Sequence, residues 1–215
     1  MTTLALNRKY RPRKIGDLVL PVKHGLKPVF QLLKAPYPSE WLFTGKSGLG
    51  KTSLAEILAQ EFADTNHIRR FVGSDLDANR VKEIETSVLH RPMYGRFHFF
   101  HVDEADEITH GGQVRLLKAL EVAENCIWVF TSNEGTEGFE SRFLSRVRHV
   151  NFTSQGILEP AAVWLANIAK REEFNLSLDE ATKIVRTTKN NLRTSLQELE
   201  LRILDAQHSE LDLVS

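Results

Sequence analysis

Apolar residues in the first 152 positions form short continuous runs that alternate with segments of helical spacing. Runs such as Phe99 to Val102 fit strands buried on both faces, and alternating strands and helices are typical of a parallel sheet with helices on both faces. The pattern predicts strands at 41–44, 70–72, 97–102, 127–131 and 149–152, and helices at 52–62, 79–89, 112–122 and 140–143.

Beyond residue 152 the strand pattern stops and only helical spacing continues. Ser177 followed by Glu180 is the signature of a capping box at a helix start. The spacing predicts three helices, at 158–173, 177–188 and 192–207, after a short polar stretch at 153–156. We therefore expect an α/β domain over 1–152 and a small three-helix domain over 153–215.

Composition narrows the function classes only a little. Lys plus Arg equals Asp plus Glu, at 28 each, so any contact with nucleic acid needs a local basic patch. The single Cys126 excludes an internal disulfide and a multi-cysteine zinc site. The chain lacks the apolar core of a signal peptide and any run of membrane-spanning length, so we expect a cytoplasmic protein with no membrane partner.

A phosphate-binding loop lies between the first predicted strand and the helix after it. Glycines permit positive φ and a close approach of backbone N–H groups to phosphate oxygens, while the helix N-terminus favours an anion. Lys51 is expected at the β and γ phosphates, and Thr52 is expected to hold Mg²⁺. The expected residues at the nucleotide are Gly45, Lys46, Ser47, Gly48, Leu49, Gly50, Lys51, Thr52 and Ser53.

An acidic pair follows the strand predicted at 97–102. Asp103 stands at the carboxyl end of that strand, where it can orient Mg²⁺ directly or through water. Glu104 is the candidate general base that polarises the attacking water. Loop and acidic pair together predict a nucleoside triphosphatase rather than a simple binding module.

The strand predicted at 127–131 also ends in polar residues. Asn133 or Thr131 can hydrogen-bond the γ phosphate or the attacking water, but asparagine is equally common as a turn cap. Arg142 and Arg146 follow this strand. Arginine stabilises the charge on a transferred phosphoryl group, often from a neighbouring subunit. Spacing alone does not distinguish this role from that of a solvated surface arginine.

The motifs taken together resemble those of the clamp-loader ATPases of the AAA+ superfamily. The motifs are similar to those of replication factor C small subunits and of the ATPase subunits of phage clamp loaders. Asp103 to Asp106 resembles the acidic box, and Gln113 with residues 116–121 resembles the helix that relays between DNA contact and the ATP site. Tyr10, Arg11 and Pro12 resemble the N-terminal segment that passes beside the adenine.

This resemblance implies roles for three further residues. Asn133 falls at the position that senses the γ phosphate, and Leu144 to Val147 resembles the Ser-Arg-Cys motif with valine in place of cysteine. Arg146 would then act on the ATP of a neighbouring AAA+ subunit, and Arg193 would touch the phosphates from the three-helix domain, which serves as a lid. The expected fold is an AAA+ core with a parallel sheet and a helical lid, and the expected cofactors are ATP and Mg²⁺.

Contact with DNA rests on the helix predicted at 79–89. Arg80 and Lys82 lie near its start, where a phosphate can meet both side-chain charge and backbone donors. Glu83 and Glu85 weaken that field, but in clamp loaders the corresponding helix tracks the DNA backbone. We therefore expect sequence-independent contact with primed or duplex DNA.

The most specific reading is an ATP-hydrolysing subunit of a sliding-clamp loader in DNA replication, with the clamp as a further partner. The sequence ends soon after the second domain, so we expect it to lack the helical collar of such subunits. That departure leaves an alternative open: an ATP-gated DNA-binding scaffold that recruits a transposase or a replicative helicase. Filaments on DNA without any clamp would favour the alternative.

Overall fold

The computed structural model describes residues 5–88, 92–122 and 124–212. These residues form two compact units, which we call the sheet unit and the helical unit. The sheet unit comprises Gly25–Lys46 and Lys51–Phe152, and the helical unit comprises the described residues of Met1–His24, Ser47–Gly50 and Thr153–Ser215. The sheet unit ends at Phe152, and residues 1–24 and 47–50 group with the helices rather than with the sheet.

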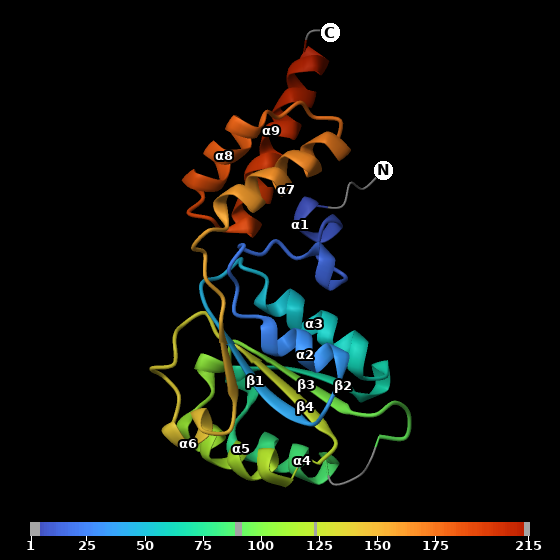
Figure 1. Cartoon of the computed structure of the whole chain (residues 1–215), viewed down its shortest axis with the longest axis vertical. Helices are drawn as coiled ribbons and strands as arrows, with labels where there is room; N and C mark the ends of the chain where they lie inside the picture. Colours follow the sequence, from blue (N-terminus) through green and yellow to red (C-terminus); the bar gives the residue numbers. More distant parts are fainter. Residues whose placement is uncertain (1–4, 89–91, 123, 213–215) are drawn as a thin grey trace. The chain divides into compact units, whose positions relative to one another are not determined.

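The sheet unit is built on five parallel strands in the order β2-β3-β4-β1-β5 (Figure 1). Parallel order arises because each strand returns through a helix, as the alternating sequence pattern predicted. The strands are β1 (Ser39–Thr44), β2 (Ile68–Val72), β3 (His98–Asp103), β4 (Cys126–Thr131) and β5 (Arg148–Asn151). This arrangement confirms the expected α/β fold class.

Helices cover both faces of the sheet. Figure 1 shows α2 and α3 over one face and α4, α5 and α6 over the other. The helices are α2 (Lys27–Lys34), α3 (Lys51–Phe62), α4 (Ala78–Val88), α5 (His110–Val122) and α6 (Ser141–Leu144). Short 3-10 helices η2 (Thr65–His67), η3 (Gly73–Asp75) and η4 (Ala105–Glu107) connect them.

Aromatic residues of the two central strands form much of the core beneath α4, α5 and α6. Phe100 stacks on Trp128 with ring centroids 4.1 Å apart, and Trp128 lies 5.8 Å from Phe130, because alternate residues of a strand share one face. Phe143 of α6 packs edge-on against Phe130 at 5.0 Å. All four side chains have no exposed surface, so the carboxyl ends of β3 and β4 are held by a dense core.

The helical unit consists of α7 (Leu158–Arg171), α8 (Leu178–Thr187) and α9 (Leu192–Asp212), with α1 (Leu6–Lys9) and η1 (Ile15–Asp17) from the N-terminal segment. Ser177 and Glu180 form the predicted capping box at the start of α8. The N-terminal segment belongs here because its polar groups bond to helical residues: the backbone N–H of Leu6 donates to Glu200 at 3.1 Å.

Strand positions agree with the sequence prediction to within two residues at each end. The prediction omitted α1 and α2, and α9 runs five residues beyond its predicted end at 207. The predicted end of the helix over 79–89 lies outside the described residues. Within the part of the chain that the structure describes, no helix combines the length and apolarity needed to cross a bilayer.

Candidate nucleotide site

The strand order brings the chemically important segments to one edge of the sheet. β3, β4 and β1 are neighbours and run parallel, so their carboxyl ends meet there. The phosphate loop follows β1, Asp103 ends β3, and Thr131 ends β4. The backbone N–H of Ser132 continues the pairing, donating to the carbonyl of Phe43 at 2.9 Å. Open α/β sheets bind ligands at this edge.

The phosphate loop adopts the glycine conformations that its sequence predicted. Gly45, Gly48 and Gly50 have φ values of 129°, 80° and 92°, which residues that carry a Cβ atom rarely adopt. α3 begins directly afterwards, at Lys51. The first backbone N–H groups of α3 have no partner within the helix, so the loop leads into a natural anion site.

Lys51 is buried, with 5% of its surface exposed, and its side chain bonds to three other predicted site residues. Its ammonium group donates to the carbonyls of Gly45 at 2.5 Å and Lys46 at 3.0 Å. It also donates to Oδ1 of Asn133 at 3.0 Å, so the end of β4 and the loop are directly linked. The oxygens of a phosphate bound to the loop would compete with these three acceptors for the Lys51 ammonium.

Asp103 accepts hydrogen bonds from two hydroxyl groups, one at the start of α3 and one at the end of β4. The Thr52 hydroxyl donates to its two carboxylate oxygens at 3.2 and 3.4 Å, and the Thr131 hydroxyl also donates to it. A carboxylate beside a hydroxyl is a hard, all-oxygen donor set that suits Mg²⁺. No cluster of three or more His, Cys, Asp or Glu ligands occurs among the described residues.

Thr131 was left as an alternative to Asn133 in the sequence analysis, but its contact is with Asp103 rather than with Lys51. The bond orients the carboxylate from the strand next to β3. The sequence shows only that a hydroxyl residue ends a predicted strand, since the strand order that brings Thr131 to Asp103 comes from the structure.

Glu104 lies beyond the end of β3 with its side chain exposed. Its backbone is left-handed, with φ 53° and ψ 47°. Such a conformation costs a residue with a side chain about 1–3 kcal/mol. The exposed carboxylate is accessible to water.

The start of α9 packs against the phosphate loop within the helical unit. The Asn191 carboxamide accepts the Thr194 N–H at 3.1 Å and so caps α9. A Cβ atom added to Gly48 would lie 2.0 Å from Oδ1 of this carboxamide, so only glycine fits there. Arg193, in the first turn of α9, is exposed two residues beyond Asn191.

A cavity of 670 Å³ in the helical unit is lined by Tyr10 and Arg11, with Trp164 on α7. Leu18 also lines it and lies 3.4 Å from the position of a Cβ added to Gly50, so the cavity adjoins the phosphate loop. Pro12 is half-buried but does not line the cavity. Two of the three residues expected beside an adenine, Tyr10 and Arg11, therefore line one cavity.

Glu172 at the end of α7 fixes the segment that carries Tyr10. It accepts the Tyr10 hydroxyl and pairs with the Lys9 ammonium at 2.7 Å. Burial, followed by the bond to Glu172, raises the pKa of Tyr10 to about 12. Burial alone would raise the pKa of Glu172, but the bonds from Lys9 and Tyr10 outweigh it and hold that pKa below its ordinary value of 4.5.

The Arg146 side chain contacts α5 and the segment around α6. Its guanidinium pairs with the Glu121 carboxylate and donates to the Arg142 carbonyl at 2.9 Å. Gln113, expected to act as a relay, is buried and accepts the Glu140 N–H at 2.8 Å. Both sets of contacts join α5 to the segment around α6.

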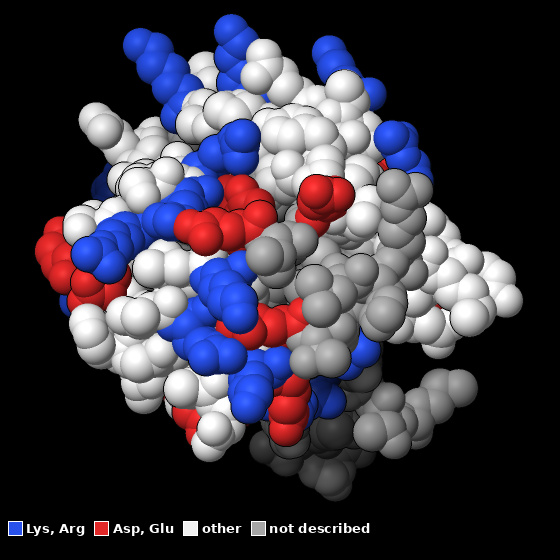
Figure 2. All heavy atoms as spheres, turned by 90° about the horizontal axis from the view of Figure 1, so that it is seen from below, with Lys and Arg blue, Asp and Glu red and all other residues white. Residues whose placement is uncertain are grey.

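The predicted DNA-contacting residues lie on α4, but the backbone donors there are occupied. Asp77 accepts hydrogen bonds from the N–H groups of Asn79 and Arg80 at 2.9 and 2.8 Å, so its carboxylate occupies the backbone donors that were expected to bind a DNA phosphate. Arg80 also pairs with Glu83 at 2.6 Å, and Lys82 is exposed. Figure 2 shows basic and acidic side chains interspersed on the face that is seen from below.

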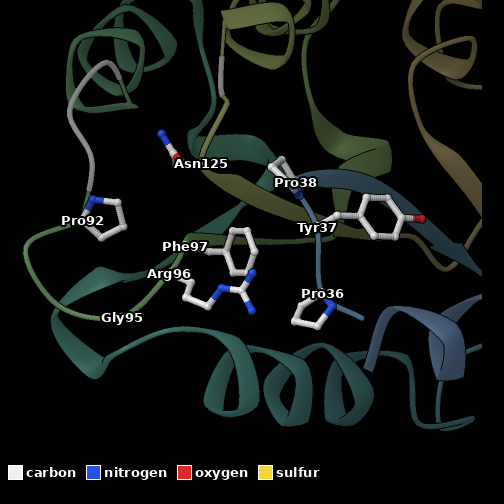
Figure 3. A pocket seen from close by; sticks show the side chains of 8 residues that line it. All are labelled: Pro36, Tyr37, Pro38, Pro92, Gly95, Arg96, Phe97 and Asn125. Carbon is white, nitrogen blue, oxygen red and sulfur yellow. The ribbon is translucent and has the colours of Figure 1, made fainter. Parts of the chain in front are cut away.

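A second cavity lies at the opposite edge of the sheet. Figure 3 shows it between the segments that precede β1, β3 and β4, lined by Tyr37, Arg96 and Phe97 among others. It contains none of the residues expected at the nucleotide.

Comparison with known proteins places this geometry in a family. Residues 41–154 match the family described as "ATPase family associated with various cellular activities (AAA)". The chain is 25% identical over 204 residues to replication factor C subunit 4 of Saccharomyces cerevisiae and 27% identical over 208 residues to the replication factor C small subunit of Methanoregula boonei. Each alignment covers 89% of this chain and 61% of the relative.

Among solved structures, the RuvB Holliday junction branch migration motor of Thermotoga maritima matches with a TM-score of 0.65 at 18% identity, over 89% of this chain and 64% of that one. This likeness concerns the fold alone. The replication factor C relatives confirm the resemblance drawn from the motifs. Because the family match covers more than half of the 215 residues, the chain belongs to the AAA family of ATPases.

Proposed function

We propose that this chain is an ATP-hydrolysing subunit of a sliding-clamp loader, working on primed or duplex DNA in replication. The convergence of Lys51 with Asn133, and of Thr52 with Asp103, carries the ATPase part of the proposal. Similarity to replication factor C small subunits over 89% of the chain supports the clamp-loading part. Other AAA+ subunits and a sliding clamp are the implied partners.

ATP binding would use the groups gathered at the sheet edge. The loop N–H groups and Lys51 would hold the phosphates. Tyr10 and Arg11 would contact the base. Thr52 and Asp103 would hold Mg²⁺, which supplies neutralisation of charge on the β and γ phosphates. Asn133 would detect the γ phosphate, and its bond to Lys51 supports this role.

Hydrolysis requires a base that activates the attacking water and cations that stabilise the charge developing on the γ phosphate. Glu104 accepts a proton as water forms the new P–O bond, and the bond from the γ phosphorus to the ADP oxygen breaks. Arg146 of a neighbouring subunit stabilises the developing charge, so turnover depends on assembly. Arg193, near the capped start of α9, reports the phosphate state to the helical unit.

DNA contact would be made by side-chain charge alone, because Asp77 occupies the N-terminal donors of α4. Arg80 and Lys82 would meet backbone phosphates without reading bases. The pairing of Arg80 with Glu83 would have to be exchanged for a phosphate on binding. We therefore expect weak, salt-sensitive binding to DNA by an isolated subunit.

Glu104→Gln tests the proposal. The variant should bind ATP normally, lose turnover by at least about a hundredfold, since general-base catalysis contributes 10²–10⁴-fold, and accumulate in an ATP-dependent complex with primed DNA. Glu107→Gln, at an exposed glutamate three residues on, is the matched control. Turnover equal to that of the control would reject Glu104 as the base.

A further inference from the structure

Helix α5 holds the segment around α6 near its beginning. Gln113, with 3% of its surface exposed, donates to the carbonyl of Gly138 at 3.1 Å and accepts the Glu140 N–H at 2.8 Å. These bonds fix residues 138–140, immediately before α6. The entry to the segment that carries Arg146 is therefore anchored to one side of α5.

The exit of the same segment is anchored near the other end of α5. Glu121 lies eight residues beyond Gln113, a spacing that keeps both side chains on the same side of a helix, about 12 Å apart along it. Its Oε1 accepts Nε of Arg146 at 3.1 Å and also accepts Nη2. Nη1 of Arg146 donates to the Arg142 carbonyl at 2.9 Å.

The backbone on either side of Arg146 is also fixed. Phe143 has no exposed surface and Val147 retains only 8%, so the core holds the chain before and after the arginine. The Arg146 side chain keeps 32% of its surface exposed. An arginine held in this way has its backbone, its side-chain direction and the plane of its guanidinium determined together.

The bonds to Glu121 and Arg142 involve three of the five N–H donors of the guanidinium. Each terminal nitrogen thus keeps one N–H for a ligand among the contacts of the described residues. One N–H on each terminal nitrogen can therefore donate to a phosphate oxygen, an acceptor with which arginine forms strong charge-assisted bonds. The pairing with Glu121 orients the guanidinium without using up its ability to bind a phosphate.

We propose that Glu121 is a positioning residue that presents Arg146 to the ATP of a neighbouring subunit. The inference rests on the proposed function, in which Arg146 acts in trans. A half-exposed ion pair of this kind contributes only about 0–1 kcal/mol to folding, so stability does not account for it. Orientation does, because a misplacement of about 1 Å at a reacting centre can cost a hundredfold in rate.

The first test compares Glu121→Ala and Glu121→Gln with Glu124→Ala, an exposed glutamate just beyond the helix. In the assembled state, Glu121→Ala should lower kcat about 10–100-fold with KM for ATP unchanged. Glu121→Gln retains an oxygen that accepts from Arg146, so its kcat should fall between wild type and the alanine variant. If Glu121→Ala matches Glu124→Ala, the positioning role is wrong.

Mixing experiments separate this role from a folding defect. In mixtures of Glu121→Ala with Glu104→Gln, interfaces that pair an intact Glu104 with an intact Glu121–Arg146 unit should regain activity. Mixtures of Glu121→Ala with Arg146→Ala should not, because neither subunit presents a working arginine. Should the alanine variant unfold, Glu121→Gln takes its place in both mixtures, and an equal gain in both would refute the proposal.

The same experiments distinguish the two levels of the argument. If Arg146→Ala is not rescued by Glu104→Gln, the trans-acting arginine of the proposed function fails. If Arg146→Ala is rescued while Glu121→Ala behaves as wild type, the proposed function stands and only the positioning role fails.

Discussion

Gly48→Ala probes the packing of α9 against the phosphate loop. The added methyl group would lie 2.0 Å from Oδ1 of Asn191, far inside van der Waals contact. The backbone at this position has φ 80°, which alanine also disfavours. The substitution thus combines a conformational penalty with a displacement of the carboxamide that caps α9.

The cost can be estimated from its two parts. Placing alanine in the left-handed region costs about 1–2 kcal/mol. The carboxamide can move aside, but it then loses its bond to the Thr194 N–H, and loss of an N-cap costs about 1 kcal/mol. A total of about 2–3 kcal/mol is large against the 5–15 kcal/mol of a typical domain, so the variant should fold with reduced stability.

Urea denaturation followed by far-ultraviolet circular dichroism measures this cost. Gly50→Ala is the matched control, because φ is 92° there but the nearest atom, Cδ2 of Leu18, lies at 3.4 Å. Gly48→Ala should exceed that control by about the 1 kcal/mol of the cap. Adding Asn191→Ala to Gly48→Ala should change almost nothing, since the cap is already lost; a fully additive double variant would refute the reasoning.

Two further predictions concern ATP binding and pH. Lys51→Ala removes the buried ammonium expected at the phosphates and should weaken ATP binding at least about tenfold. Binding of a fluorescent ATP analogue measures this effect, with the exposed Lys23→Ala as the control, and retained affinity would contradict the loop assignment. Because the folded pKa of Glu172 is lowered, its bonds with Lys9 and Tyr10 stabilise the fold above pH 4.5 and lose that effect as pH falls through the lowered value. The difference in urea midpoint between wild type and Glu172→Gln should therefore shrink below pH 4.5, and a constant difference would disprove this linkage.

The sheet could be predicted because its strands are buried on both faces and read as unbroken apolar runs. β3 and β4 are such runs, and their positions were predicted to within a residue. Helix α2 was not predicted, although Pro28 in its first turn and the buried Val29 and Leu32 on one face were usable signals. Its eight residues are too short for helical periodicity to stand out.

Contacts between distant residues lay beyond the sequence. The bonds from Lys9 and Tyr10 to Glu172 span more than 160 residues, so the grouping of the N-terminal segment with the helical unit had no local signal. The bond from Thr131 to Asp103 depends on strand order, which the pattern of runs does not determine. The capping of α4 by Asp77 was predictable, since aspartate at a helix start is a strong N-cap.

The most direct test of the central claim is the steady-state ATPase rate per subunit, measured across protein concentration with and without primed DNA. If Arg146 of one subunit completes the site of another, the rate should rise steeply with concentration and rise again when primed DNA is added. Nucleotide binding measured in parallel shows that the site is intact. A rate that is indifferent to both concentration and DNA, with ATP still bound, would contradict an assembly-dependent ATPase acting on DNA.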